Sequence, residues 1–282
     1  PITINRLLSE MVEAGCEYCF MEVSSIGVEQ ERVSGLEFAV GIFSNLTHDH
    51  LDYHGTFAEY LRCKKMFFDN LPASAVAITN VDDRNGEVMV QNTAAKVMTY
   101  SCRAGADHTC RILEESFEGM LLKIDGTEVW TRLVGAHNAY NLLAIYSTAV
   151  ALGTPAEEAL LALSTLKSAP GRLETLRGPR DLSVAIDYAH TPDAMENVLK
   201  TLRAPGFRYT ENTSIGIVTF NMQQQAYIED LLDAERAKDP SLEPYFAETT
   251  PEAVFVKNLE NVQGDERGVI YFSTTYGPDE EG

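Results

Sequence analysis

The stretch FAVGIFSNLTHDHLDYHGTFAEYLRCKKMFFDNLPASAVAIT, residues 38–79, decides the fold class. It begins with an apolar run, 38–44, that predicts a strand, and it ends with a second such run, 75–79. Between them, Thr56 and Glu59 have the spacing of a capping box, in which two side chains satisfy the free backbone amides at the start of a helix. A strand, a helix and a second strand in this order are typical of α/β proteins with parallel sheets.

The same alternation of predicted strands and helices extends over the rest of the chain. Helices are predicted over 4–14, 56–71, 137–152, 192–202 and 223–237 and after Pro155, and strands over 18–23, 38–44, 75–79, 182–186, 215–220, 254–257 and 269–273, with a short helix and a strand within 88–99. Residues 109–134 alternate like antiparallel strands. The predicted fold is α/β with a mostly parallel sheet, followed by a smaller α/β segment.

The composition excludes two classes of function. The net charge is −20 over 282 residues, and neither half of the chain holds the basic patch that nucleic-acid binders normally show. The apolar runs are far shorter than the ~20 residues that cross a bilayer, and the first residues lack the pattern of a signal peptide. We therefore expect a cytoplasmic protein that binds neither nucleic acid nor membrane.

The five cysteines are an odd number, and in this setting we expect reduced thiols. Cys16 and Cys19 have CxxC spacing. The alternative to free thiols is therefore a zinc site formed by this pair with His108 and Cys110. Cys19, however, leads directly into the predicted strand 18–23. A strand does not offer the turn that a zinc-binding cysteine pair needs, so we favour ordinary thiols.

The most informative segment is SNLTHDHLDYHG, residues 44–55. It carries three histidines and two aspartates directly after a predicted strand. Open α/β sheets place their ligand sites at the carboxyl ends of strands. The segment therefore predicts a metal or phosphate site, and a solvated loop is the alternative.

Two residues outside this loop have the chemistry to complete a metal site. Lys64 lies on the apolar stripe of the predicted helix, four residues after Tyr60, where a desolvated and partly neutral amine can react with carbon dioxide. The resulting carbamate is a hard oxygen ligand suited to magnesium. The alternative is a lysine that buries its stem and keeps its head in water. Glu22, at the end of a predicted strand, either holds the metal or caps the next turn.

Across these stretches and several others, the chain resembles the Mur ligases. The matching segments are Met21–Ser25 with Gln30 and Arg32, Asn45–Gly55, Glu59–Lys64, Asn80–Asp83, Gly135–Asn138 with Asn141, Pro170–Glu174 and Asp187–Asp193. They follow the order of the family from residue 1 to about 204. Within the family, they resemble the enzymes that add the third amino acid to UDP-N-acetylmuramoyl-dipeptide.

The resemblance implies a fold and an activity. Residues 1–170 would form a P-loop NTPase-like central domain, and 171–206 the start of a third domain. In peptidoglycan synthesis, ATP would phosphorylate a peptide carboxylate, and the amino group of the incoming amino acid would attack the acyl phosphate. ATP and Mg²⁺ would be the cofactors, and a UDP-muramoyl peptide and an amino acid the substrates.

The resemblance also implies a role for each site residue. Glu22, His50 and Lys64 would be the catalytic metal-binding residues, with Lys64 carbamylated. Ser24, Gln30 and Arg32 would contact the UDP-muramoyl peptide, and Asn138, Asn141, Arg172, Asp187 and His190 the nucleotide. The pattern of residues agrees independently for Glu22, the histidine-rich loop and Lys64. For Asn138 and Asn141, helix capping is the alternative.

Two departures from the family pattern bear on activity. Ile26 stands where the family usually has a histidine. This difference affects how precisely the substrate would be positioned. The 282 residues contain no Gly-x-x-x-x-Gly-Lys-Ser/Thr loop, the backbone cradle for the phosphates of ATP. We therefore expect that this chain by itself does not catalyse ligation.

Residues from about 209 to 282 do not continue the family pattern. Segments 214–221 and 254–273 resemble the second RecA-like domain of superfamily-one helicases, with Gln263, Gly264 and Glu266 similar to that family's fifth motif. A turn between two strands is the alternative for that motif. The predicted organisation is thus a Mur-ligase core joined near residue 206 to a Rossmann-like or RecA-like segment, 207–282. A helicase or ATPase fragment and a folded chimera without activity are the alternatives.

Overall fold

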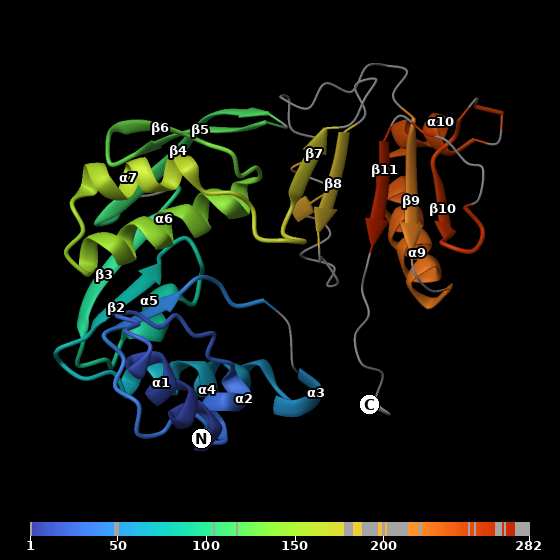
Figure 1. The fold of residues 1–282 in the computed structure, drawn as a ribbon. Coiled ribbons are helices and arrows are strands. Elements are labelled where there is room, and N and C mark those ends of the chain that lie inside the picture. The colour runs from blue at the N-terminus through green and yellow to red at the C-terminus, as the bar shows by residue number, and fades with distance from the viewer. Residues whose placement is uncertain are drawn as a thin grey trace. The chain divides into compact units, whose positions relative to one another are not determined.

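The computed structural model describes residues 2–47, 51–103, 105–116, 118–177, 183–187, 197–198, 201, 214–219, 222–247, 249–250, 252–262, 267 and 269–273. Within these residues the strands form one six-stranded and one five-stranded sheet (Figure 1). The predicted α/β class with mostly parallel pairing is confirmed. None of the described helices combines the length and the apolar character that crossing a membrane would require.

The first sheet has its strands in chain order. They are β1 (Val40–Phe43), β2 (Val76–Asn80), β3 (Lys96–Ser101), β4 (His108–Ser116), β5 (Gly119–Ile124) and β6 (Thr127–Thr131). β1, β2 and β3 pair in parallel, and α4 (Phe57–Asp69) and α5 (Gly86–Val90) supply the crossovers that parallel pairing needs. Between β5 and β6, Asp125 and Gly126 both have positive φ, as in the tight turns that join hairpin strands.

The predicted start of α4 is confirmed. The side chain of Thr56 caps the helix and accepts a hydrogen bond from the Glu59 amide at 3.2 Å. The apolar face of α4 packs against β1, where the rings of Phe43 and Phe68 meet edge to face at 6.3 Å between centroids. The end of α4 lies very close to β1. A Cβ built at Gly41 of this strand would lie 2.8 Å from the side chain of Leu71, which follows the helix.

The predicted strand over 18–23 is wrong. Residues 16–24 form no regular element, and the side chains of Tyr18 and Phe20 are 59% and 79% exposed. An apolar run becomes a strand only when a neighbouring strand satisfies its backbone groups. Among the described residues, β1 forms one edge of its sheet and pairs only with β2. Residues 18–23 therefore pair with no strand of this sheet.

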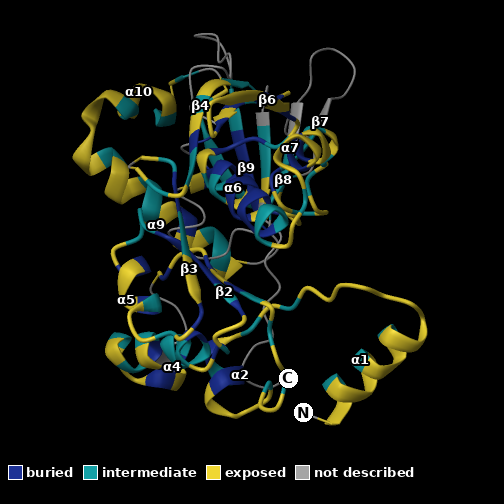
Figure 2. Ribbon diagram, turned by 90° about the vertical axis from the view of Figure 1, so that its left-hand side faces the viewer, coloured by how far each residue is buried: buried dark blue, intermediate teal, exposed yellow. Residues whose placement is uncertain are grey.

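Helices before and after this sheet agree with the sequence. α1 (Ile2–Glu13) is followed by a turn at Gly15, whose φ is +82°, and the helix has no buried residue (Figure 2). α6 (Ala136–Ala151) and α7 (Ala156–Thr165) are the helices predicted from His137 and after Pro155. Two short helices, α2 (Ser25–Glu29) and α3 (Leu51–His54), were not predicted.

The second sheet has the strand order β10-β9-β11-β8-β7. Its strands are β7 (Glu174–Arg177), β8 (Ser183–Asp187), β9 (Ile215–Thr219), β10 (Phe255–Asn258) and β11 (Val269–Ser273). β7 is antiparallel to β8, and the other pairs are parallel. The sequence assigned β8 to one family and β9, β10 and β11 to another, yet these four strands belong to one sheet. Of the predicted helix 192–202, only Asn197, Val198 and Thr201 lie within the described residues, and they are helical.

Between β9 and β10 the described chain forms α9 (Met222–Lys238), the short 3-10 helix η1 (Pro240–Leu242) and α10 (Glu243–Phe246). The Gln225 amide fixes α9 to β10, because its nitrogen donates to the Val256 carbonyl at 3.2 Å and its oxygen accepts from the Asn258 amide at 3.1 Å. The predicted helicase-like motif at Gln263–Glu266 lies outside the described residues.

The chain forms two compact units. The first comprises Pro1–Arg111, Lys123–Thr127 and Ala139–Leu161, and the second Ile112–Leu122, Glu128–Asn138 and Ala162–Gly282. The domain boundaries predicted near residues 170 and 206 stay predictions.

Candidate functional site

Two segments of the first unit meet through the amide of Gln30. Its nitrogen donates to the Tyr53 hydroxyl at 3.1 Å, and its oxygen accepts from the Arg32 guanidinium at 2.6 and 3.0 Å. Ser24 caps α2 by accepting from the Gly27 amide at 3.0 Å. A Cβ built at Gly27 would lie near both Ser24 Oγ and Arg32 Cδ. The three predicted substrate contacts, Ser24, Gln30 and Arg32, therefore lie together, next to the short helix α3 that carries Tyr53.

A second link between the same segments is buried. Ser25 Oγ and His54 Nε2 lie 2.8 Å apart, and both residues are almost inaccessible to solvent. The His54 ring also packs against the Tyr60 ring of α4 at 5.4 Å between centroids. The sequence pattern assigns no individual role to Ser25, Tyr53 or His54. The signal available was the presence of His54 in the histidine-rich loop.

Lys64 lies on the same face of α4 as Tyr60, as the four-residue spacing predicted, and its amine lies over the Tyr60 ring. Its Nζ is 5.3 Å from the ring centroid, and the residue is half-buried. A cation–π contact of this kind favours the charged ammonium. Formation of a carbamate would therefore have to compete with this contact. The neighbouring Lys65 instead pairs with Asp69.

Of the other two predicted metal ligands, Glu22 lies in an unexpected position and His50 is not among the described residues. Glu22 is exposed in the irregular segment 16–24, so its expected position at the end of a strand is wrong. His50 lies outside the described residues. A shared site of Glu22, His50 and Lys64 stays a prediction.

Asp82, in the predicted motif Asn80–Asp83, holds several segments together. Its carboxylate accepts hydrogen bonds from Ser101 Oγ and the Cys102 amide at 2.7 Å, from the Tyr140 hydroxyl at 2.8 Å and from the Arg103 amide at 3.1 Å. Burial raises the pKa of this carboxyl, but the four donors outweigh it and leave the pKa below its usual value. Asp82 thus joins the end of β2 to the end of β3 and to α6.

The same motif also fixes the segment after β1. The Asn80 side chain donates to the Ser44 carbonyl at 2.8 Å, and Asp83 accepts from the Leu46 amide at 3.0 Å. These bonds position the first residues of the histidine-rich segment at the carboxyl end of the sheet, where the sequence placed a ligand site.

The residues predicted to contact the nucleotide differ in burial and in hydrogen bonding. Asn138 is buried, and its side-chain nitrogen donates to the Val134 carbonyl at 2.7 Å. Asn141 and Arg172 are exposed, and Asp187 accepts from the Leu173 amide at 2.7 Å. His190 lies outside the described residues. The contacts of these residues with a nucleotide stay predictions.

All five cysteines are free thiols. Cys16 and Cys19 are exposed, whereas Cys63 and Cys110 are buried. His108 pairs with Asp125 at 2.6 Å. Burial raises the pKa of the Cys63 thiol, and the nearby Glu29 carboxylate acts in the same direction.

The family model for the Mur ligase middle domain matches residues 1–149. The chain belongs to the Mur ligase family.

Among its relatives is the UDP-N-acetylmuramoyl-L-alanyl-D-glutamate–2,6-diaminopimelate ligase of Phocaeicola vulgatus, which is 56% identical over 202 residues, 72% of this chain and 42% of that protein. The enzyme of the same name from Geobacillus kaustophilus is 37% identical over 212 residues and is covered to 43%. The chain thus spans less than half the length of these two relatives.

The likeness in structure extends beyond the 202 residues matched in sequence. A solved UDP-N-acetylmuramoyl-L-alanyl-D-glutamate–2,6-diaminopimelate ligase is similar over 96% of this chain and 62% of its own, with a TM-score of 0.67 and 25% identity. The MurF ligase of Thermotoga maritima, solved with ADP, has the same fold, with a TM-score of 0.63 over 89% of this chain and 61% of its own at 14% identity. The comparisons give the helicase resemblance no support.

Proposed function

We propose that the chain is part of an ATP-dependent ligase that adds 2,6-diaminopimelate to UDP-N-acetylmuramoyl-L-alanyl-D-glutamate in peptidoglycan synthesis. The names of the relatives support the proposal, as does one observation: the Gln30 amide holds the exposed Arg32 guanidinium beside Tyr53. A guanidinium in a fixed orientation binds carboxylate or phosphate through paired hydrogen bonds. The UDP-linked dipeptide carries both groups.

The donors that would hold magnesium are Glu22, His50 and a carbamate on Lys64. Glu22 offers an exposed carboxylate and Lys64 a half-buried amine, and carboxylate-type oxygens are the ligands that magnesium prefers. Bound ATP with magnesium would supply the phosphoryl group and neutralise its charge. Asn138, Asn141, Arg172, Asp187 and His190 are the proposed nucleotide contacts.

Arg32→Ala should weaken binding of UDP-N-acetylmuramoyl-L-alanyl-D-glutamate to the chain by roughly tenfold or more, because a charge-assisted hydrogen bond contributes about 1.5–3 kcal/mol. Isothermal titration calorimetry measures this directly and needs no turnover. Arg62→Ala is the matched control, since Arg62 is an exposed arginine of α4 bonded to Glu59. If the parent chain binds no UDP-linked dipeptide, or if both variants bind like the parent, the proposal is wrong.

Lys64 should carry a carbamate when the chain is equilibrated with carbon-13-labelled bicarbonate. The neutral amine attacks carbon dioxide, forms a C–N bond and releases a proton, and nuclear magnetic resonance detects the labelled carbonyl. Lys64→Ala should remove the signal, and Lys65→Ala should leave it. A parent chain without the signal, or one whose signal survives Lys64→Ala, would show that Lys64 is only a lysine packed on Tyr60.

A further inference from the structure

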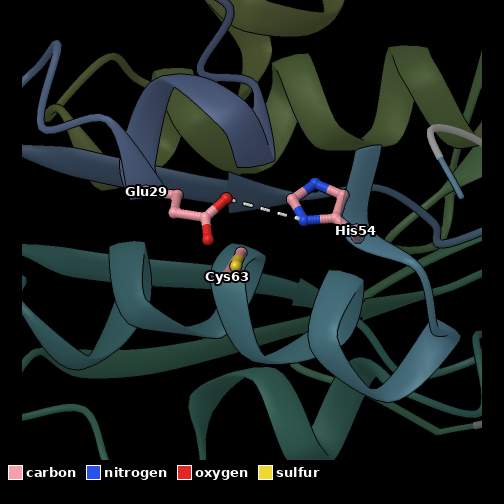
Figure 3. A group of neighbouring side chains, drawn as sticks. All are labelled: Glu29, His54 and Cys63. Carbon is pink, nitrogen blue, oxygen red and sulfur yellow. Dashed lines mark ion pairs between the residues drawn. The ribbon is translucent and has the colours of Figure 1, made fainter. Parts of the chain in front are cut away.

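Three side chains from three helices of the first unit converge at one point (Figure 3). Glu29 ends α2, His54 ends α3, and Cys63 lies midway along α4. One ligand atom from each lies within 4.8 Å of the other two, and His54 Nδ1 is 3.7 Å from a Glu29 carboxylate oxygen. No family resemblance assigns these residues a role.

The histidine in this group has an unsatisfied nitrogen. The His54 side chain has no exposed surface, and its Nδ1 makes no hydrogen bond within the part of the chain that the structure describes. A buried polar atom left without a partner destabilises the folded chain. This nitrogen faces the carboxylate of Glu29, close to the fully buried thiol of Cys63.

We propose that Glu29, His54 and Cys63 bind a zinc ion through one oxygen, one nitrogen and one sulfur. Zinc takes this mixed donor set in tetrahedral sites, and three protein ligands leave the fourth position for water or another ligand. Magnesium does not fit, because it demands oxygen ligands. The site is therefore distinct in chemistry from the magnesium site formed by Glu22, His50 and Lys64 under the proposed function.

Ser25 supports the proposal from the other side of the imidazole. Metal-binding histidines donate their second ring N–H to an oxygen, which fixes the tautomer and the ring orientation. Ser25 Oγ lies 2.8 Å from His54 Nε2, in the position of such an acceptor. The proton on Nε2 would leave the lone pair of Nδ1 directed at the metal.

The spacing of the three ligand atoms suits a site that closes on its ion. Bond lengths of about 2.0 Å to nitrogen and oxygen and about 2.3 Å to sulfur put tetrahedral ligand atoms roughly 3.3–3.6 Å apart. His54 and Glu29 are nearly at this distance. Glu29 is partly exposed at the end of a short helix, so rotation of its side chain can bring the carboxylate closer.

Cobalt binding to the full chain, freed of metal with a chelator, tests the site. Cobalt(II) replaces zinc in tetrahedral sites and gives a thiolate charge-transfer band in the near ultraviolet. The parent chain should show this band with one ion per chain, and zinc should displace it. Cys63→Ser should lose the band, and His54→Gln and Glu29→Gln should each weaken cobalt binding by roughly tenfold or more.

Two matched controls separate this site from other metal-binding groups. A Cys16→Ser, Cys19→Ser double variant should keep the band, and Glu31→Gln should bind cobalt like the parent. Circular dichroism checks that each variant is folded. If Cys63→Ser does not fold, the comparison of Glu29→Gln with Glu31→Gln decides. No band in the parent, a band that depends on Cys16 and Cys19, or equal affinity of the two glutamine variants overturns the proposal.

Discussion

Gly86→Ala should destabilise the chain by about 3 kcal/mol or more, because the added methyl group has no space. A Cβ at Gly86 would lie 1.9 Å from the carbonyl oxygen of Asn80, a backbone atom at the end of β2. Relief requires moving α5 away from β2, which would also break the 2.7 Å bond from Thr79 Oγ1 to the Gly86 carbonyl.

Urea denaturation followed by circular dichroism measures the free energy of unfolding of this variant. Gly105→Ala is the matched control, since a Cβ there would meet no atom within 4 Å. It should change the stability by less than about 0.5 kcal/mol. Equal stability of the two variants would contradict the close approach of α5 to the end of β2.

Asp82→Ala should be the second strongly destabilising change, with a loss of about 3 kcal/mol. The substitution removes the acceptor of four hydrogen bonds at once and leaves their donors, two of them backbone amides, without it. Thermal unfolding should show the loss, and Asp230→Ala, at an exposed carboxylate of α9, should show little change. A loss no greater than that of the control would mean that Asp82 does not hold these segments together.

The same carboxylate makes stability depend on acid. Because the pKa of Asp82 in the folded chain lies below its unfolded value of about 3.9, its contribution is fully present above that value and disappears as the pH falls through the folded pKa. The stability difference between the parent and Asp82→Asn should therefore be constant near neutral pH and shrink in strong acid. A difference that persists unchanged at low pH would show that the bonds do not depend on the ionised form.

Local signals in the sequence predicted much of the fold. The capping box at Thr56 and Glu59 predicted the start of α4, and the four-residue spacing predicted that Lys64 lies on the same face as Tyr60. The prediction of a strand over 18–23 was wrong, because a strand depends on a neighbouring strand and the apolar pattern contains no information about that neighbour.

The candidate site was harder to predict for the same reason. Gln30 and Tyr53 are 23 residues apart, and Ser25 and His54 are 29 residues apart, so no local pattern indicates that they meet. The resemblance to a family predicted the first group through Gln30 and Arg32. Nothing in it predicted the convergence of Glu29, His54 and Cys63, which depends on how three helices pack.

The position of β11 between β8 and β9 has a consequence for biosynthesis. β8 cannot join β9 in the observed sheet until β11 is available to pair with both, and about 80 residues separate the end of β8 from the start of β11. At synthesis rates of about 5–20 residues per second, the ribosome needs on the order of 4–16 s to make that stretch. During this interval the nascent chain exposes an unpaired edge of β8 and, once β9 has been made, an unpaired edge of β9 as well. Such edges are the surfaces that chaperones shield and that mispair in aggregation.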